Sequence, residues 1–506
     1  MVKSYNSVIF VSRAAFDDNV VVVTESYLKG AQFSNDTVNN SGGLSRLDIL
    51  TLQDLAARNQ LVNLTTSQCS QEFGGAYQSD YKSVLFVTDS KSQTSSLLQT
   101  IHSGSISQYP GIDDMDGIAL NGSTVLYCLA QQGSAQDQTC TVGVNGLLLG
   151  IVVVLNLVTI ITTSIVLTKR LFEPLVTLGD AISSFLKDPD PTTRGACLMS
   201  KPDVWQGRWG LREAKYWIPS NHYWFRSPSL PRWIFFIFMW LATAGLASTA
   251  LVLSVRADPK GTLSAFGTVS THAFYSLPST LPVWAAAVIA SLPQLLLAVL
   301  YFVTNSLLTT YFLSHESSLY ALGEPLPLRV SANPEGQQTT SLYLTLPRPW
   351  SWFLVTLFAG MSFVLSQSVL VVSVFLTDSA PAASSPGASS TASAGTLVGL
   401  GFSGVGLLAF GAILVVLGAV VVGLGFRTAP AAVLVNGQAV GNPLALPAGS
   451  CSAVLSARSH RIPGEASAWK HPLVWGVVHE GRGMGASHCT YTARGAAQLD
   501  IARSYA

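Results

Sequence analysis

The chain has 506 residues, of which 49% are hydrophobic and only 11% are charged, and its formal net charge is +1. A soluble domain carries about 25% charged residues, so this deficit points to lipid as the surrounding solvent. The near-neutral balance excludes the overall positive field that favours nucleic-acid binding. Six cysteines are too few for a disulfide scaffold in a chain of this length.

The first segment, residues 1–143, has the charged composition of an ordinary small domain. The runs "VVVTESYL" and "KSVLFVTDS" predict strands, because β-branched and aromatic residues are concentrated in them. The run "LSRLDILTLQDLAARNQL" predicts a helix. We therefore expect an α+β domain over this segment.

Four Asn-x-Ser/Thr sequons make Asn35, Asn39, Asn63 and Asn121 candidates for glycosylation. All four precede the first long apolar stretch. Because sequons are modified on the lumenal side of the secretory membranes, we expect residues 1–143 to be extracytoplasmic.

The cysteines of the same segment suggest one bridge. Cys128 and Cys140, in the run "YCLAQQGSAQDQTC", are candidates for a disulfide in an oxidising compartment. Cys69 is then left over. It either pairs with a cysteine upstream of this sequence or is a buried free thiol.

Five apolar stretches follow, and none contains a charged residue in its centre. About 20 apolar residues of helix cross a bilayer, so we predict five transmembrane helices, over residues 144–168, 233–255, 283–313, 352–376 and 399–426. Pro293 predicts a kink or tilt in the third. The spacing of Ala419 and Gly423 in the fifth would let two helices approach closely.

The loops between the spans differ in basic residues. Residues 169–232 hold ten Lys and Arg and the tail 427–506 holds seven, whereas 256–282 holds two and 377–398 holds none. Since basic loops stay in the cytosol, we expect 169–232, 314–351 and the tail to be cytosolic, and the Ser/Ala/Pro/Gly-rich linker 377–398 to be external. Residues 1–16 lack a signal-peptide core, so we also expect a membrane-targeting segment upstream of this sequence.

The run "LVTLGDAISSFLKDPDPTT" predicts a short amphipathic helix. Thr177 and Asp180 have the spacing of a capping box, and Pro189 ends the helix. Its apolar face consists of Leu178, Ile182, Phe185 and Leu186. Asp180, Asp188 and Asp190 are interpreted as caps and solvated turn residues rather than as metal ligands or acid catalysts, because no histidine stands close by in the sequence.

The next stretch of the same loop alternates aromatic and basic residues. It contains Trp205, Arg208, Trp209, Arg212, Lys215, Trp217, Trp224, Arg226, Arg232 and Trp233. Such interleaving can bind single-stranded nucleic acid, but beside a membrane it more often forms an interfacial belt that contacts lipid phosphates. We favour the belt.

Few residues suggest chemistry. Charge-free spans disfavour ion-coupled pumps, although uncharged polar groups could line a pore. The candidates are Asn156, Gln294, Asn305 and Gln367, and each more often forms an interhelical hydrogen bond. In the tail, zinc binding is disfavoured by the irregular spacing of Cys451, His460, His471, His479, His488 and Cys489. The sequence predicts no catalytic, cofactor-binding or metal-binding residue.

The chain resembles a fungal family of polytopic membrane proteins known only as a domain of unknown function. Matching runs include "YNSVIF", "TESYLKGA", "LVTLGDAISSFLKDPDPTT", "GQQTTSLYLTLP", "GSCS" and "WGVV", in order along almost the whole chain. The resemblance implies fungal origin and a further spanning helix before the "YNSVIF" run. It implies no activity.

Together these patterns predict an α-helical polytopic membrane protein with an amino-terminal α+β extracytoplasmic domain. We expect a non-enzymatic sensor, scaffold or structural component of the cell surface or secretory pathway, with the lipid bilayer, further copies or other membrane proteins as partners and no nucleic acid. One alternative is a facilitator or channel for an uncharged solute. Another is a membrane enzyme at the cytosolic face, which requires Asp180, Asp190, His315 and His488 to meet in one pocket.

Overall fold

The computed structural model describes twenty-one stretches of the chain. They are residues 8–12, 19–24, 46–68, 81–88, 97–102, 119–120, 123–132, 140–144, 146–169, 175–208, 214–257, 263–267, 274–277, 281, 283–331, 333–342, 345–376, 395–435, 438–445, 451–479 and 485–506. The chain divides into two compact units. The first contains residues 1–156, 246–294 and 363–410, and the second contains 157–245, 295–362 and 411–506.

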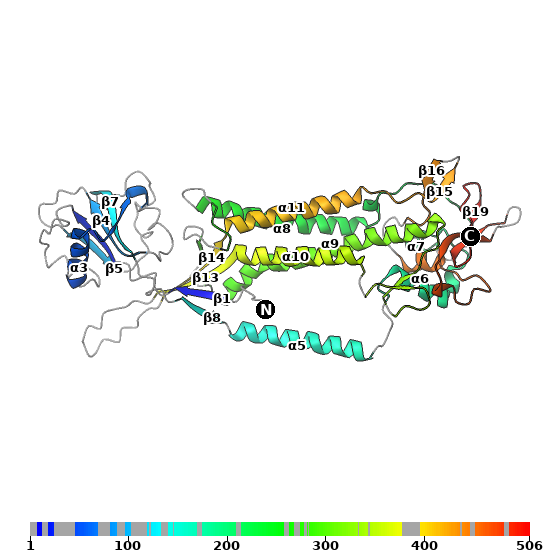
Figure 1. Cartoon of the computed structure of the whole chain (residues 1–506), viewed down its shortest axis with the longest axis horizontal. Helices are drawn as coiled ribbons and strands as arrows, with labels where there is room; N and C mark the ends of the chain where they lie inside the picture. Colours follow the sequence, from blue (N-terminus) through cyan, green and yellow to red (C-terminus); the bar gives the residue numbers. More distant parts are fainter. Residues whose placement is uncertain are drawn as a thin grey trace. The chain divides into compact units, whose positions relative to one another are not determined.

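The first unit contains a mixed sheet with strand order β3-β7-β4-β2-β5, in which β6 also pairs with β7. Figure 1 labels β4, β5 and β7 of this sheet. Its strands are β2 (Asn19–Thr24), β3 (Val62–Thr65), β4 (Tyr81–Thr88), β5 (Leu97–His102), β6 (Ala119–Leu120) and β7 (Ser123–Gln132), and its helix is α3 (Arg46–Ala57). Strands β2 and β4 and helix α3 lie where the sequence predicts them. Their extracytoplasmic location stays a prediction.

A second sheet of this unit has the order β10-β14-β13-β1-β8. Its strands are β1 (Val8–Ser12), β8 (Cys140–Val144), β10 (Phe274–Ser276), β13 (Val369–Leu376) and β14 (Gly395–Phe402). Two of these strands correct the predicted spans, since 369–376 and 399–402 were expected to be helical. Both are short apolar runs, which periodicity cannot assign to helix or strand. The rest of the predicted linker, 377–394, lies outside the described residues.

Five helices of the described chain are long and apolar enough to cross a membrane, which confirms the predicted number. They are α5 (Gly146–Lys169), α8 (Leu230–Ala257), α9 (Val283–Leu319), α10 (Arg348–Ser368) and α11 (Gly404–Gly425). The described side chains of α5 are exposed along its whole length. Helix α9 begins where predicted but continues six residues beyond residue 313.

Within the second unit, glycines of α11 allow other helices to approach. A Cβ at Gly418 would lie 3.1 Å from Nε1 of Trp240 on α8, and this Nε1 donates a 3.0 Å hydrogen bond to the carbonyl oxygen of Leu414. Gly425 lies against Tyr311 of α9. Gly423, part of the predicted small-residue motif, has no such neighbour among the described residues. The close contacts therefore use other glycines than the motif.

The described residues within 175–227, 314–342 and 427–506, which also belong to the second unit, pack together and are called the tail domain. Its helices are α6 (Leu178–Lys187), α7 (Lys201–Trp205) and α12 (Ser452–Ala457), with 3₁₀ turns η4 (Pro191–Thr193), η6 (Trp224–Arg226), η7 (Tyr320–Leu322) and η8 (Ala468–Lys470). Its strands are β9 (Lys215–Tyr216), β11 (Arg329–Val330), β12 (Thr339–Thr340), β15 (Val433–Val435), β16 (Gln438–Gly441), β17 (Val474–His479), β18 (His488–Thr492) and β19 (Ser504–Tyr505). They form two-stranded pairs.

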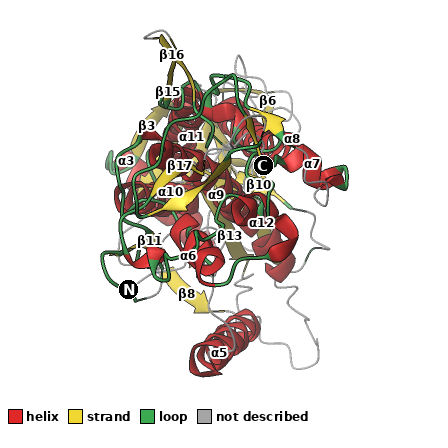
Figure 2. Ribbon diagram, turned by 90° about the vertical axis from the view of Figure 1, so that its right-hand side faces the viewer, coloured by secondary structure: helices red, strands yellow, loops and turns green. Residues whose placement is uncertain are grey.

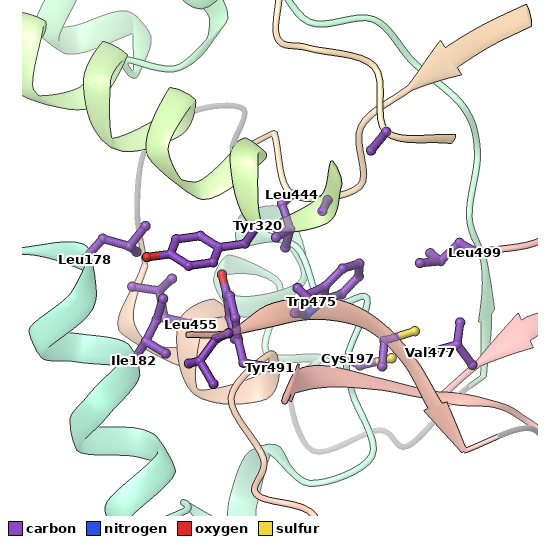
Figure 3. Packing of buried hydrophobic residues seen from close by; sticks show 14 of the residues in the cluster. Leu178, Ile182, Cys197, Tyr320, Leu444, Leu455, Trp475, Val477, Tyr491 and Leu499 are labelled. Atoms are coloured by element: carbon purple, nitrogen blue, oxygen red, sulfur yellow. The ribbon is translucent and has the colours of Figure 1, made fainter. Parts of the chain in front are cut away.

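One hydrophobic core joins these short elements (Figure 3). Ile182 of α6, Tyr320 of η7 and Tyr491 of β18 are almost completely buried in it, and the rings of the two tyrosines meet edge to face with centroids 5.6 Å apart. Segments separated by more than a hundred residues thus bury their apolar surface together, which is the main stabilising contribution in such a domain.

The predicted capping box of α6 is confirmed. The backbone N–H and the hydroxyl of Thr177 donate to Oδ2 of Asp180 at 2.9 and 2.8 Å, and Asp180 N–H donates to the Thr177 hydroxyl. Oδ1 of Asp180 also accepts from the N–H of Ser331 at 2.8 Å. The cap therefore fixes α6 to the end of β11, beside which α6 lies in Figure 2.

The predicted tryptophan belt is only partly compatible with the structure. Trp205 is exposed, but Trp217 belongs to the tail-domain core. Trp224 is buried between His315 and Arg427, with its ring 5.1 Å from the imidazole and 4.9 Å from the guanidinium. At least two of the five tryptophans are therefore packing residues, and Trp209 lies outside the described residues.

Candidate functional site

The four residues that a cytosolic-face enzyme would need do not form one pocket. Asp180 caps α6. Asp190 caps η4, where its Oδ1 accepts from the N–H and hydroxyl of Thr192 at 2.9 and 2.8 Å. The ring of His315 lies against that of Trp224, tilted by 40°. Only His488 faces a large cavity, so the enzyme hypothesis lacks its predicted site.

The polar residues of the spans do not form a common site either. Asn156 is exposed, whereas Gln294, Asn305 and Gln367 are half-buried. Gln367 lies beside Gly267, in the first unit, and Asn305 belongs to the second. The cavities of about 750 and 400 Å³ that the described residues form contain none of the four in their linings.

The tail domain has an open cleft with a volume of about 750 Å³. Three parts of the chain line it: the loop after α6, the loop after α12, and the end of the β17–β18 pair at which His479 and His488 lie. The lining residues are Pro189, Pro191, Arg194, Gly195, His460, Arg461, Ile462, Pro463, Gly464, Ala466, Val478, His479 and His488. We call this cavity the His/Arg cleft.

The first wall is the segment that follows α6. Prolines 189 and 191 end the helix and hold the chain in a single 3₁₀ turn that Asp190 caps. Arg194 comes directly after this turn and its side chain is exposed. The cap of η4 by Asp190 therefore determines where Arg194, the first cationic residue of the cleft, lies.

The second wall is centred on His460, which is 7% exposed. Its Nε2 shares a 3.0 Å hydrogen bond with the hydroxyl of Thr193, which also contacts the Ser456 hydroxyl at 2.8 Å. The backbone oxygen of His460 accepts from the Thr490 hydroxyl at 2.7 Å. His460 therefore ties the three walls together.

The third wall is the end of the antiparallel β17–β18 pair. His479 and His488 are partners in register across the two strands, next to a bulge at Val477. Such partners have Cβ atoms about 5 Å apart. Nδ1 of His488 lies 2.6 Å from the backbone oxygen of Ala506, which fixes the ring orientation and makes Nδ1 the donor.

The His/Arg cleft is lined by several side chains that are positively charged or can be protonated. Its lining contains two arginines and three histidines and no carboxylate. Two carboxylates lie next to lining residues in the sequence: Asp190 accepts from Thr192 and acts electrostatically on His460, and Glu465 accepts from Thr492 at 2.7 Å. Burial, together with the nearby His488, lowers the pKa of His460. The arrangement is suited to binding an anion.

The sequence did not predict this site. His460 and His479 were considered only as zinc ligands, and His488 was considered as a zinc ligand and as a residue of the enzyme alternative. The described residues contain no group of three metal-binding side chains placed to hold a metal ion. Arg194 and Arg461 were not singled out at all. The one sequence feature that these two arginines share is a proline nearby, and the two loops that contain them are more than 260 residues apart.

The remaining predicted site residues lie in the first unit. Asn63 is exposed on β3, as glycosylation requires, but Asn35, Asn39 and Asn121 lie outside the described residues. Cys128 is buried and disulfide-bonded. The side chain of Cys140 is not among those described, so the predicted pairing of these two cysteines stays a prediction.

Comparison with known proteins gives one match. A protein-family model described as "Domain of unknown function (DUF8419)" matches residues 177–217 and 211–500, which is more than half of the chain and includes every wall of the His/Arg cleft. No curated protein and no solved structure matches the chain.

Proposed function

Because the chain belongs to the family described as Domain of unknown function (DUF8419), and because its matched region contains the His/Arg cleft, we propose that it is a multi-pass membrane protein that works as a non-enzymatic sensor. Its tail domain binds a molecule that carries a phosphate monoester. The observation that supports this proposal is the cleft lined by two arginines and three histidines without a carboxylate.

Phosphate chemistry fits this lining. A phosphate monoester carries a charge of about −1.5 to −2 at pH 7, and arginine binds its oxygens with two parallel N–H groups. Arg194 and Arg461 both line the cleft, and we propose that both contact one phosphate. A cavity of about 750 Å³ lies within the range of roughly 300–1,000 Å³ that is usual for small-molecule sites.

The location of this site follows from the distribution of basic residues. The loop 169–232 and the tail carry most of the Lys and Arg, so we place the tail domain in the cytosol. The segment 1–143, which carries the four glycosylation candidates, would then face the lumen or the cell exterior. A protein of the cell surface or secretory pathway would then sense a ligand that is present in the cytosol.

Ligand binding can be tested on the full chain in nanodiscs of phosphatidylcholine. Inorganic phosphate is titrated while the intrinsic tryptophan fluorescence and the unfolding temperature are followed. The double variant Arg194→Gln/Arg461→Gln should weaken binding at least about tenfold, since each lost charge-assisted hydrogen bond is worth roughly 1.5–3 kcal/mol. Arg503→Gln, which changes an exposed arginine outside the cleft lining, is the matched control.

Two further arms separate a soluble ligand from a lipid headgroup. Nanodiscs with phosphatidic acid present a phosphate monoester. Nanodiscs with phosphatidylglycerol present a phosphate diester, and their surface is also negatively charged. Phosphatidic acid alone competing with inorganic phosphate identifies a headgroup, and competition by neither lipid identifies a soluble ligand. Binding that the double variant and the Arg503 control affect equally would refute the proposal.

A further inference from the structure

One edge of the tail domain exposes large apolar side chains. Trp205 of α7 and Ile218 are each 80% exposed, and Tyr216 of β9 is 66% exposed. Large apolar side chains that gather on a surface mark an interaction site, whereas single ones need no explanation. We call these three residues the apolar patch.

The two elements that carry the apolar patch are joined by an ion pair. Nζ of Lys215 on β9 lies 2.7 Å from Oδ2 of Asp203 on α7, and the same oxygen accepts from the N–H and the hydroxyl of Ser200 at 2.9 and 2.6 Å. Arg208 lines one small cavity together with Asp203 and Lys215. Helix α7 and strand β9 therefore belong to one surface.

The chain around β9 directs the apolar patch away from the core. Trp217 is packed in the tail-domain core, whereas its neighbours Tyr216 and Ile218 are exposed. Because successive side chains of an extended segment point to opposite sides, the burial of Trp217 holds both neighbours outward. Figure 2 shows α7 projecting sideways past α9 and α11.

Exposed aromatic rings link this segment to the ends of two spanning helices. The rings of Tyr223 and Phe225 stack with centroids 5.6 Å apart, and Phe225 lies 6.2 Å from Phe426, directly after α11. Nε1 of Trp233 on α8 donates to the Phe225 carbonyl oxygen at 2.9 Å. Ile218 is at most about 18 Å from Tyr223, since an extended chain covers about 3.6 Å per residue. The apolar patch therefore lies close to where α8 and α11 end.

The charges around the apolar patch favour an anionic partner. Residues 201–208 and 214–218 contain three basic residues, Lys201, Arg208 and Lys215, and one acidic residue, Asp203, which is paired with Lys215. Tryptophan, tyrosine and basic residues beside spanning helices are typical of contact with lipid headgroups. Protein–protein interfaces, in contrast, are depleted in lysine.

We propose that the apolar patch is a docking surface for the anionic lipid surface of the membrane that the chain spans. Trp205, Tyr216 and Ile218 enter the interfacial region, and Lys201 and Arg208 contact lipid phosphates. Docking would hold the tail domain, and the His/Arg cleft with it, in one orientation to the membrane. The inference does not depend on the ligand proposed for the cleft.

The test uses the full chain in nanodiscs, with the photo-crosslinking residue p-benzoylphenylalanine in place of Ile218. After illumination, mass spectrometry should identify lipid adducts at this position. Their yield should be about fivefold higher when phosphatidylserine is mixed into the phosphatidylcholine, because a basic residue near an anionic surface contributes a factor of about five. His471, an exposed tail-domain residue outside the apolar patch, is the matched control position and should give few adducts with either lipid.

Variants separate the apolar contribution from the charged one. Trp205→Ser/Tyr216→Ser should lower the adduct yield at position 218 at least about fivefold, because two apolar side chains no longer enter the interface. Arg208→Gln should reduce the gain from phosphatidylserine. All three side chains are exposed, so the variants should fold normally, which circular dichroism and elution profiles check.

The outcomes also distinguish this inference from the proposal for the cleft. Arg194→Gln/Arg461→Gln should leave the adduct yield at position 218 unchanged. Equal yields at positions 218 and 471, equal yields in the two kinds of nanodisc, or no lipid adduct at all would overturn the proposal. Crosslinks from position 218 to a second copy of the chain in place of lipid would also overturn it, since the patch would then be a protein interface.

Discussion

The spanning helices and the tail domain are held together in different ways. In the described spans, contacts between helices are mostly apolar, and a few small residues such as Gly418 and Gly425 set the approach. The tail domain has only short helices and two-stranded pairs. Its parts are joined by buried polar groups whose partners are far apart in sequence, such as Asp180 with Ser331. The apolar composition therefore identifies the spanning helices, whereas the tail domain depends on particular hydrogen-bonded pairs of residues that are far apart in the sequence.

The largest effect should come from removing one of these pairs. Asp180→Ala deletes the capping box and leaves the N–H groups of Thr177 and Ser331 without an acceptor. We expect a loss of roughly 3 kcal/mol, from the cap and the unpaired buried donors together. The measurement is the unfolding temperature of the detergent-solubilised protein. Asp188→Ala, at an exposed carboxylate two residues beyond the core residue Leu186, should leave it nearly unchanged.

A glycine-to-alanine pair compares the two regions directly. At Gly179 of α6, a methyl group would collide with the backbone carbonyl of Arg329, which cannot rotate away, so Gly179→Ala should cost about 2 kcal/mol. At Gly418 the obstacle is the Trp240 side chain, and the cost should be about 1 kcal/mol or less. Gly411→Ala, with no neighbour in the described residues, is the control in α11. Equal losses at Gly179 and Gly418 would contradict the comparison.

The smallest effect concerns pH. Burial lowers the pKa of His460 in the folded chain, so the unfolded chain binds the proton first as pH falls. Stability is therefore complete above pH 6.5 and declines below it. Between pH 7 and pH 5, His460→Gln should reduce this decline by up to about 1 kcal/mol. His471→Gln, at an exposed histidine, should show the wild-type decline.

The difference between the two regions also explains what could be predicted. Charge-free apolar runs identified the five spans, and the Thr177–Asp180 spacing identified the cap of α6, because both signals are local. Residues 369–376 were assigned to the wrong element, since their apolar character fits a strand equally well. The His/Arg cleft could not be predicted, because Arg194 and His460 become neighbours only through the folding of the whole tail domain.

Helix α9 has a mechanical consequence. Its residues 295–319 form one uninterrupted helix in the second unit, about 37 Å long at 1.5 Å per residue. Ser317, near its end, donates to the Leu444 carbonyl oxygen at 3.1 Å, and Glu316 pairs with Arg329 at 2.8 Å. A rotation or tilt of α9 would therefore displace Tyr320 and strain its aromatic contact with Tyr491.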